Sequence, residues 1–539
     1  MELFKIEDLT FRYPETDIDV LKKISLSVNE GDIVLITGRS GCGKTTLLNH
    51  LKSSMTPAGT LSGNIYYKGR PLSDVDFKTQ SKEIGYVLQN PSDQTVTDKV
   101  WHELCFGAEN IGMDPEDISR RIAETSNFFD IGEWYDRDIN DLSGGQKQLV
   151  NLAAVMVLGP EVLILDEPTA QLDPVSANEF LNAIYRINNE LGTTIIMTEH
   201  RLESVFSHAD QLVYMENGQI VYDGSPSRFY SARINEGRDP SSDFFSFLPT
   251  VMQVYYSLEE SGDSPVNVRD GRKWLRDYAE RFGTLGATYH KEYTHPFNES
   301  ILELKNVYFR YDKEGRDILK SLNLQLDKGT ILSVIGGNGR GKSTLLKLIS
   351  GHLKPYSGKV ICEKECKISV LPQECVLMFS HDSVMEELTG VGGSEESIKS
   401  AVELFELNGL LARHPYDLSM GQQKCLGLAM MYLSDCDILL LDEVTGGLDP
   451  VFKNKFGNYF QELKNLGKSI ISVSHDIEFC SRYSDYVGML FNGDLIGTDR
   501  PNRFFFSNTF YTTLGARLSK GIFNDTVNSE DIINICRNR

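Results

Sequence analysis

Short apolar runs alternate along this chain with longer amphipathic stretches, and their lengths predict buried strands and covering helices. Two runs, residues 33–37 and 331–335, each lead into a glycine-rich loop and then a leucine-bearing helical pattern. Further runs of strand length follow in each half, at residues 162–165, 194–197, 438–441 and 470–473. Apolar strands that alternate with helices are typical of a mostly parallel sheet covered on both faces. We therefore expect an α/β fold.

The chain repeats itself once, with every motif in the same order. FRYPE at Phe11 returns as FRYDK at Phe309, GRSGCGKTTLLNHL as GGNGRGKSTLLKLI, and VLILDEPTAQLDP as ILLLDEVTGGLDP. The repeating unit is about 230 residues, far longer than the repeat of a solenoid protein. The sequence thus predicts two related domains.

Motif spacing shows where the two halves differ. From the lysine of the glycine-rich loop to the next motif glutamine there are 45 residues in the first half and 31 in the second. A further 54 and 46 residues lead to the serine of the following motif, and 23 residues in both halves lead from there to an aspartate. We expect the shortening, about 22 residues in all, in a peripheral strand layer and a helical insert.

The repeat gives the expected boundaries. Residues 1–235 form a first domain, 236–300 a linker with a helical element, 301–505 a second domain and 506–539 a C-terminal segment. The linker region contains 7 Lys/Arg against 11 Asp/Glu and is interrupted by Pro240, Pro249 and Pro265. The aromatic cluster that begins at Phe504 is expected to be packed, because large apolar patches seldom stay exposed.

Composition narrows the function classes. The chain has 539 residues, 40% of them hydrophobic, and a formal net charge of −22. Such a charge argues against a surface built for nucleic acid or for bulk attraction to anionic lipid. No run of 18 apolar residues occurs, and the N-terminus lacks the pattern of a secretory signal. If the protein works at a membrane, a protein partner should hold it there.

Each half carries the pattern GxxxxGK[ST], at residues 38–45 and 336–343. Its glycines let backbone N–H groups wrap closely around phosphates, and the N-terminus of the following helix favours the negative charge. Lys44 and Lys342 are then expected to reach the β- and γ-phosphates, and the hydroxyls of Thr45 and Ser343 to ligate Mg²⁺.

An acidic pair follows a buried strand in each half. Asp166 and Asp442 end apolar runs, where an acid that meets the metal should lie. Glu167 and Glu443 come next, and we expect them to be the general bases that polarise the attacking water.

The motif LSGGQ at residues 142–146 makes the pattern specific: the chain resembles the ATP-binding cassette (ABC) family over about 450 residues. The resemblance implies two P-loop NTPase domains, each with a mostly parallel core sheet, an antiparallel strand layer and a helical subdomain. It also implies that the signature of each cassette closes over the ATP bound to the other, so that the two cassettes pair within one chain.

The resemblance assigns roles by position. Tyr13 and Tyr311 would stack on adenine, and Gln89 and Gln373 would sense Mg²⁺ and the transmembrane partner. Asp173 and Asp449 fall in the D-loops, and His200 and His475 would join the two glutamates in catalysis by contacting the γ-phosphate. The residues expected at ATP are Tyr13, Gly38, Arg39, Ser40, Gly41, Cys42, Gly43, Lys44, Thr45, Thr46, Gln89, Ser143, Gly144, Gly145, Gln146, Tyr311, Gly336, Gly337, Asn338, Gly339, Arg340, Gly341, Lys342, Ser343, Thr344, Gln373, Ser419, Met420, Gly421 and Gln422. Those expected at Mg²⁺ are Thr45, Gln89, Asp166, Ser343, Gln373 and Asp442.

The second signature departs from the family pattern. It reads LSMGQ, with Met420 where glycine is usual, and Val444 stands where the first half has Pro168. Because signatures act on the opposite cassette, Met420 should affect the site built on Lys44. We expect two functioning but unequal sites, the second-half Walker site being the more active.

The segment after Gln89 and the C-terminal tail resemble the fused, two-cassette ATPases of energy-coupling factor (ECF) transporters. That resemblance implies uptake of a vitamin or transition-metal ion, with a transmembrane coupling subunit and a small substrate-binding membrane subunit as partners. It places the protein at the cytoplasmic face of the membrane. An exporter ATPase, or a soluble tandem-cassette protein acting on ribosomes or nucleic acid, are the alternatives.

Overall fold

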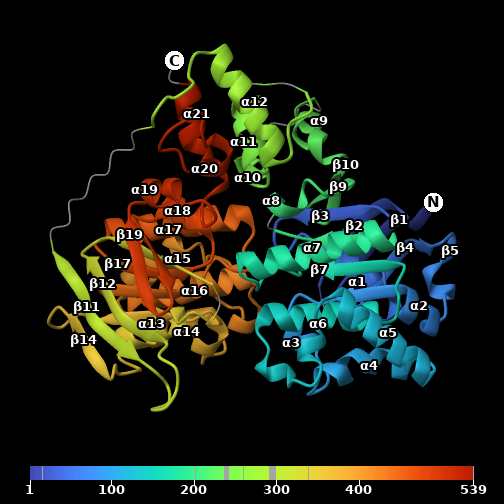
Figure 1. Ribbon diagram of the computed structural model, residues 1–539, viewed down its shortest axis with the longest axis horizontal. Helices are drawn as coiled ribbons and strands as arrows, with labels where there is room; N and C mark the ends of the chain where they lie inside the picture. Colours follow the sequence, from blue (N-terminus) through green and yellow to red (C-terminus); the bar gives the residue numbers. More distant parts are fainter. Residues whose placement is uncertain are drawn as a thin grey trace. The chain divides into compact units, whose positions relative to one another are not determined.

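The computed structural model describes residues 1–14, 16–200, 202–235, 242–258, 260, 262–289, 299–337 and 339–537. It divides into two compact units. The first comprises Met1–Pro249 and Ser261–Asn267, and the second comprises Thr250–Glu260 and Val268–Arg539. Each unit contains one copy of the repeat, and the ribbon of each is shown in Figure 1.

The first unit is built around a six-stranded sheet of order β10-β9-β3-β8-β7-β6. The strands pair in parallel except for β10, which is antiparallel to β9. Every residue of β3, β7 and β8 is buried, which explains why their sequences are continuous apolar runs. The strands are β3 (Ile33–Gly38), β6 (Ile84–Val87), β7 (Val162–Asp166), β8 (Thr194–Thr198), β9 (Gln211–Glu216) and β10 (Gln219–Gly224).

An antiparallel layer of order β2-β1-β4-β5 and a set of helices complete this unit. The layer consists of β1 (Glu2–Arg12), β2 (Leu21–Asn29), β4 (Thr60–Tyr67) and β5 (Arg70–Pro71). The helices are α1 (Lys44–His50), α2 (Phe77–Glu83), α3 (Pro91–Gln94), α4 (Val100–Asn110), α5 (Pro115–Phe128), α6 (Gly144–Met156), α7 (Pro174–Leu191), α8 (Leu202–Val205), α9 (Phe229–Asn235) and α10 (Ser242–Ser246).

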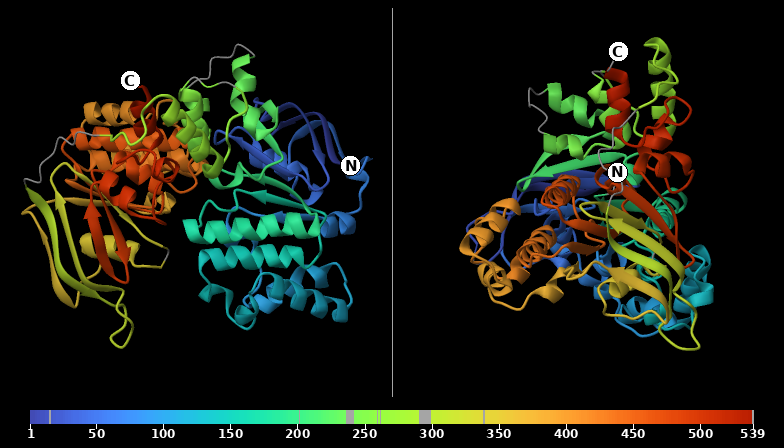
Figure 2. Two further views of the ribbon diagram at one scale, coloured as in Figure 1. Left: turned by 45° about the horizontal axis from the view of Figure 1, so that its top comes forward. Right: turned by 90° about the vertical axis from the view of Figure 1, so that its left-hand side faces the viewer.

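The second unit has the same plan. Its six-stranded sheet has the order β15-β16-β17-β13-β18-β19, with only β19 antiparallel to its neighbour among the described strands. A three-stranded layer, β12-β11-β14, accompanies it and is drawn in yellow to yellow-green in Figure 2. The strands are β11 (Ser300–Phe309), β12 (Leu319–Asp327), β13 (Ile331–Ile335), β14 (Ser357–Cys362), β15 (Ile368–Leu371), β16 (Ile438–Asp442), β17 (Ser469–Ser474), β18 (Tyr486–Phe491) and β19 (Asp494–Asp499). The helices of its cassette are α13 (Lys342–Ile349), α14 (Val384–Val391), α15 (Glu395–Leu404), α16 (Met420–Leu433), α17 (Pro450–Asn465), α18 (Ile477–Tyr483) and α19 (Pro501–Ser507).

The shortening of the second half falls in two peripheral places. Between β4 and β6 the first unit has β5 and α2, whereas a short connection, residues 363–367, joins β14 to β15 in the second. In the helical insert, α4 and α5 have 11 and 14 residues, and α14 and α15 have 8 and 10. Both places are the ones that the spacing of the motifs predicts.

The linker and the C-terminal segment share one apolar core. Helices α11 (Thr250–Ser257) and α12 (Val268–Arg281) pack with α20 (Leu514–Ser519) and α21 (Ser529–Arg537), side by side in Figure 1. Val251, Leu275, Leu518 and Ile532 are buried in this core. We call these four helices the shared helical module.

The aromatic cluster that precedes α20 is packed apart from one ring. Phe504 and Phe505 are buried in a small core with Cys480 and Val527. Phe510 is 84% exposed.

Close packing in the shared helical module predicts that it will not tolerate a side chain at Gly271 of α12. A Cβ there would lie 2.4 Å from Cγ1 of Val251 and 3.0 Å from Cδ1 of Leu518. Overpacking of this kind costs about 1–3 kcal/mol, more than the roughly 1 kcal/mol that alanine gains over glycine in a helix. We expect Gly271→Ala to lower the thermal unfolding midpoint.

The matched control is Gly107→Ala in α4, where the nearest atom to a new Cβ would be Cδ1 of Leu158, at 3.6 Å. This substitution is expected to leave the midpoint unchanged or to raise it, because helix propensity then acts alone. An equal rise in both variants would contradict the packing described for α12.

Candidate functional site

Each unit places a glycine-rich loop between a buried strand and a helix. In the first unit the loop joins β3 to α1, and in the second it joins β13 to α13. Gly43 and Gly341, the residues just before the two helices, have φ values of 102° and 101°, a region that favours glycine. A Cβ at Gly38 would lie 2.3 Å from the carbonyl oxygen of Met215. These positions therefore require glycine for backbone conformation and for close packing.

Both loops curl around a buried lysine. The Nζ atom of Lys44 donates to the carbonyl oxygens of the first two residues of its own loop, at 2.9 and 3.2 Å. Lys342 does the same at 2.9 and 3.3 Å. Each side chain is only 5% exposed. The ammonium groups are thus fixed at the centre of the loops, where a bound phosphate chain would be recognised.

Hydroxyl groups surround the aspartates that end β7 and β16. Asp166 accepts from the hydroxyl of Thr198 at 2.7 Å and also from Thr45. Burial raises the pKa of Asp166 despite these hydrogen bonds. Burial likewise raises the pKa of Asp442, although the hydrogen bond from the hydroxyl of Ser343 acts to lower it. Within the described residues, Oδ1 of Asp442 is buried without a hydrogen-bond partner, which leaves it open to a hard cation such as Mg²⁺.

The two glutamates follow these aspartates in a strained conformation. Glu167 and Glu443 have φ values of 43° and 48°, an arrangement that costs about 1–3 kcal/mol for a residue with a side chain. Their amides are fixed by the adjacent strand. Glu167 N donates to Oγ1 of Thr198 at 2.8 Å, and Glu443 N to the carbonyl oxygen of Val473 at 3.0 Å. The sharp turn directs both carboxylates away from the strands that carry them.

In the first cassette, Glu167 contacts the motif glutamine and the motif histidine. Nε2 of Gln89 donates to its Oε2 at 2.8 Å, and Nε2 of His200 lies 2.8 Å from its Oε1. Three residues from distant parts of the chain therefore meet at one carboxylate.

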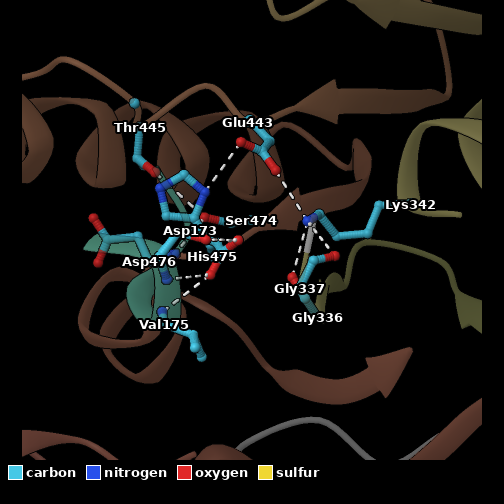
Figure 3. Close-up of polar contacts among 12 residues, drawn as sticks. Asp173, Val175, Gly336, Gly337, Lys342, Glu443, Thr445, Ser474, His475 and Asp476 are labelled. Atoms are coloured by element: carbon cyan, nitrogen blue, oxygen red, sulfur yellow. Dashed lines mark hydrogen bonds and ion pairs between the residues drawn. The ribbon is translucent and has the colours of Figure 1, made fainter. Parts of the chain in front are cut away.

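In the second cassette, Glu443 lies between a lysine and a histidine (Figure 3). Its Oε1 is 3.0 Å from Nζ of Lys342, and its Oε2 is 3.0 Å from Nδ1 of His475. Burial opposes ionisation of Glu443, but the hydrogen bond and charge of His475 and the charge of Lys342 lower its pKa to about 2. Gln373, the counterpart of Gln89, has an exposed side chain. The glutamates of the two cassettes thus have different partners.

The aromatic residues expected at adenine lie beside the phosphate loops. The hydroxyl groups of Tyr13 and Tyr311 are each 3.1 Å from Oγ1 of a threonine, Thr46 and Thr344 respectively. Each ring packs edge-on against the phenylalanine two residues earlier in its strand. Tyr311 is 58% exposed, so its ring has free surface on which a base could stack.

The signature motifs begin helices α6 and α16. Ser143 and Ser419 cap these helices, and each forms a capping box with the glutamine three residues later, Gln146 or Gln422. The D-loop aspartates, Asp173 and Asp449, cap α7 and α17 by accepting from backbone N–H groups in the first turn of each helix.

The two glycine positions of a signature have different steric limits. A Cβ at Gly145 would lie 2.7 Å from Cβ of Ser176, and one at Gly421 would lie 2.9 Å from the ring of Phe452. At Gly144, by contrast, there is nothing within 4 Å. Met420 replaces this unhindered glycine, which explains why the second fold accommodates a large side chain there.

The remaining predicted residues lie mainly in the loops themselves. Arg39, Ser40, Gly41, Gly339 and Arg340 are exposed, and Cys42 is buried. Asn338 lies outside the described residues.

Each helical insert contains a buried glutamate that was not predicted from the sequence. Glu103 accepts from the amides of Val96 and Thr97, and Glu387 from those of Ser380 and His381. Both glutamates lie 14 residues after the motif glutamine. That equal spacing, together with the shared Val-x-x-Glu-Leu pattern at residues 100–104 and 384–388, is a signal that could have identified them. Each one fixes the loop that leads from the motif glutamine into the insert.

The pKa of Glu443 predicts a pH-dependent contribution to stability. The pKa is about 2 in the folded chain against an ordinary value of 4.5. The stabilisation is therefore fully present above pH 4.5 and is lost as the pH falls toward 2; it amounts to about 3 kcal/mol at neutral pH. We expect Glu443→Gln to lower the thermal unfolding midpoint clearly at pH 7 and by less at pH 3.5. Glu124→Gln, at an exposed position in α5, is the control and should change neither; an equal effect of Glu443→Gln at both pH values would contradict the assignment.

Comparison with known proteins identifies the family of the chain. The family model for the ABC transporter matches residues 21–170 and 319–446. A provisionally assigned ABC transporter ATP-binding protein of Bacillus anthracis is 39% identical over 99% of this chain and 98% of its own length. Solved cbiO1 from Clostridium perfringens, part of the ABC transporter complex cbiONQ, is 30% identical over 43% of this chain and 92% of its own, with a TM-score of 0.39.

A second solved structure shows the fold of the whole chain. The archaeal ribosome recycling factor aABCE1, solved with the ribosomal stalk protein aP1, is 20% identical over 92% of both chains, with a TM-score of 0.59. None of the described helices combines the length and apolar character that crossing a bilayer requires. The chain belongs to the ABC transporter family and carries two ATP-binding cassettes of the kind that bind and hydrolyse ATP.

Proposed function

We propose that this protein is the ATPase subunit of an ECF-type membrane importer and powers uptake of a vitamin or transition-metal ion through a separate transmembrane partner. The observation that carries the proposal is an exposed apolar surface directly after the motif glutamine of each cassette. The resemblance of residues 90–113 and of the C-terminal tail to fused ECF ATPases supports the importer class.

The exposed surface has the character of a protein-binding site. In the first cassette it consists of Val96, Trp101 and Phe106, and in the second of Leu377 and Met385. Val96 is 64% exposed and Leu377 is 76% exposed. Uncovered apolar residues of this size are typical of interaction sites, and tryptophan is enriched where a partner is held most tightly. We call these two sets the docking surfaces.

In the first cassette the docking surface is joined to the ATP site by short connections. Glu103 holds the loop that carries Val96, and this loop begins at Gln89, which contacts Glu167. Movement of the carboxylate during turnover would therefore reach the docking surface through a few buried contacts. A membrane partner bound there would receive the motion directly.

The contact between Lys342 and Glu443 in the second cassette indicates how ATP would bind there. Lys342 contacts Glu443 and two loop carbonyls. Because phosphate oxygens are a stronger anionic partner for this lysine, bound ATP would take the place of Glu443 and release its carboxylate to orient water. Thr45 with Asp166, and Ser343 with Asp442, supply the hydroxyl and carboxylate oxygens suited to Mg²⁺, which would neutralise phosphate charge.

Pairing of the cassettes rests on the family resemblance. Each signature would complete the ATP site of the other half, and His200 and His475 would contact the γ-phosphates. Met420 then acts on the site that contains Lys44 and Glu167. Because only one of the two ATP sites is completed by a signature with methionine, the two sites are expected to differ in activity.

We predict that the two glutamates contribute unequally to turnover. Glu443→Gln should reduce steady-state ATP hydrolysis about tenfold and Glu167→Gln by only about a tenth, because removing the base of the faster site leaves only the slower one, and the reverse. Hydrolysis is measured on the purified chain, and the double variant gives the background rate. Equal losses from the two single variants would reject the unequal-site hypothesis.

A second prediction concerns the membrane partner. Tagged protein isolated from detergent-solubilised membranes should retain a transmembrane protein and a small membrane subunit, identified by mass spectrometry. Combining Trp101→Glu with Leu377→Glu should reduce their recovery at least tenfold, as expected when the two apolar contacts together lose more than about 1.4 kcal/mol of binding free energy.

Leu466→Glu is the control, because Leu466 is exposed but lies outside the docking surfaces; it should leave recovery unchanged. Capture of ribosomes in place of membrane proteins would overturn the transporter proposal. If Leu466→Glu reduced the recovery of the membrane subunits equally, the proposed role of the docking surfaces would be rejected.

A further inference from the structure

A lysine is buried inside the second cassette, away from the phosphate loop. Lys424 belongs to the signature helix α16, and only 3% of its surface is exposed. Its Nζ atom donates to the carbonyl oxygen of Gly446 at 2.6 Å. Gly446 lies in the D-loop, three residues before Asp449. The signature helix is therefore tied to the D-loop of its own cassette by a charged hydrogen bond.

The equivalent position in the first cassette makes a different connection. Gln148 also lies five residues after the signature serine and is fully buried. Its Nε2 atom donates to the carbonyl oxygen of Leu88, the residue before Gln89. The same point on the signature helix thus binds the loop of the motif glutamine in one cassette and the D-loop in the other.

A second substitution compensates for this change. Pro372 occupies the position of Leu88, and its carbonyl oxygen accepts from Sγ of Cys375 at 3.7 Å. The first cassette has Pro91 at the position of Cys375, and proline has no backbone N–H and no polar side chain. The cysteine supplies the hydrogen bond that a glutamine would have made, which leaves Lys424 free to reach the D-loop.

Met420 adds a second contact between the same two segments. Its sulfur would lie 2.7 Å from a Cβ placed on Gly447, the residue after Gly446. Positions 420 and 424 of the second signature helix both differ from their counterparts in the first, and both side chains meet the D-loop. In the first cassette, a Cβ at Gly144 would meet nothing within 4 Å.

The surroundings of Lys424 weaken the preference of its side chain for the charged form. Burial lowers its pKa to about 8, and the charge of Lys453 on α17 acts in the same direction. Cys375 and Glu443 are the acidic groups that oppose this shift. Lys453 itself is paired with Asp476 at 2.6 Å. A buried ammonium group that is only partly compensated costs stability, which points to a role other than holding the fold together.

We propose that Lys424 is a positioning residue that fixes the D-loop of the second cassette to its signature helix, so that the two segments move as one element during turnover. In the first cassette the signature helix is fixed to the loop of Gln89 instead. The inference rests only on the ATP hydrolysis of the family and not on the membrane partner. It is tested on the purified full-length chain, so failure of the transporter proposal would leave it unaffected.

The test compares Lys424→Met with wild type. Methionine retains most of the volume of lysine but removes both the charge and the hydrogen-bond donor. We expect kcat for ATP hydrolysis to fall about fivefold or more with KM for ATP within twofold of wild type, since a mispositioned D-loop impairs turnover rather than nucleotide binding. The thermal unfolding midpoint at pH 7 should be unchanged or higher, because an incompletely compensated buried charge is removed.

A pH series provides the second readout. The folded pKa of Lys424 lies below its ordinary value of 10.5, so the charge destabilises the fold fully below about pH 8, and this penalty fades as the pH rises toward 10.5. The gain in midpoint of Lys424→Met over wild type should therefore be larger at pH 7 than at pH 9.5. Turnover of the wild type should decline above pH 8 by a step that Lys424→Met lacks.

The matched control is Lys455→Met, which removes a lysine of α17 that pairs at the surface with Glu406; its kcat should stay within twofold of wild type. A kcat of Lys424→Met within twofold of wild type would overturn the proposal. A fall in kcat accompanied by a lower unfolding midpoint would also overturn it, because Lys424 would then serve the fold and not the position of the D-loop.

Discussion

The architecture of each cassette depends on holding a lysine ammonium group in a site closed to water. Lys44 and Lys342 are almost fully buried, and the carbonyl oxygens of their own loops compensate part of the charge. This requirement explains the neighbouring sequence. The loop must bend tightly enough to turn its carbonyls inward, and glycine must therefore stand where φ is positive and where the chain passes close to a neighbouring strand. The acidic residues at the ends of β7 and β16 lie where they can share the compensation.

Much of this arrangement could be predicted from sequence because it depends on local backbone requirements. The glycines, the lysines, the apolar strands and the acids that end them lie in short segments whose spacing is fixed by strand and helix lengths. The partners of Glu443 could not be predicted. Glu167 contacts a glutamine where Glu443 contacts a lysine, and this difference depends on how loops from separate segments meet. The shared helical module was also beyond the sequence argument, because helices near residues 260 and 525 show no pattern that identifies each other as partners.

Several differences between the halves occur together around the signature helix and the D-loop. Lys424 changes the connection of the signature helix, and Cys375 restores the hydrogen bond that this change would remove. Met420 occupies the signature position with free space and extends toward Gly447. The second half has also lost a strand and a helix at its periphery, while the spacing from signature to aspartate is kept. Divergence is thus concentrated in how segments are connected around an unchanged chemical frame.

The shared helical module affects the order in which parts of the protein can fold during synthesis. Its first two helices leave the ribosome before the second cassette, and their partners leave after it, with roughly 230 residues in between, which corresponds to tens of seconds of synthesis at about 5–20 residues per second. During that interval the apolar faces of α11 and α12 lack the surface that later covers them. The second cassette must therefore be completed while its entry helices are still exposed, and the synthesis of α20 and α21 is what closes this part of the fold. A chain released early would carry a recognisable apolar signal of incompleteness for chaperones and proteases.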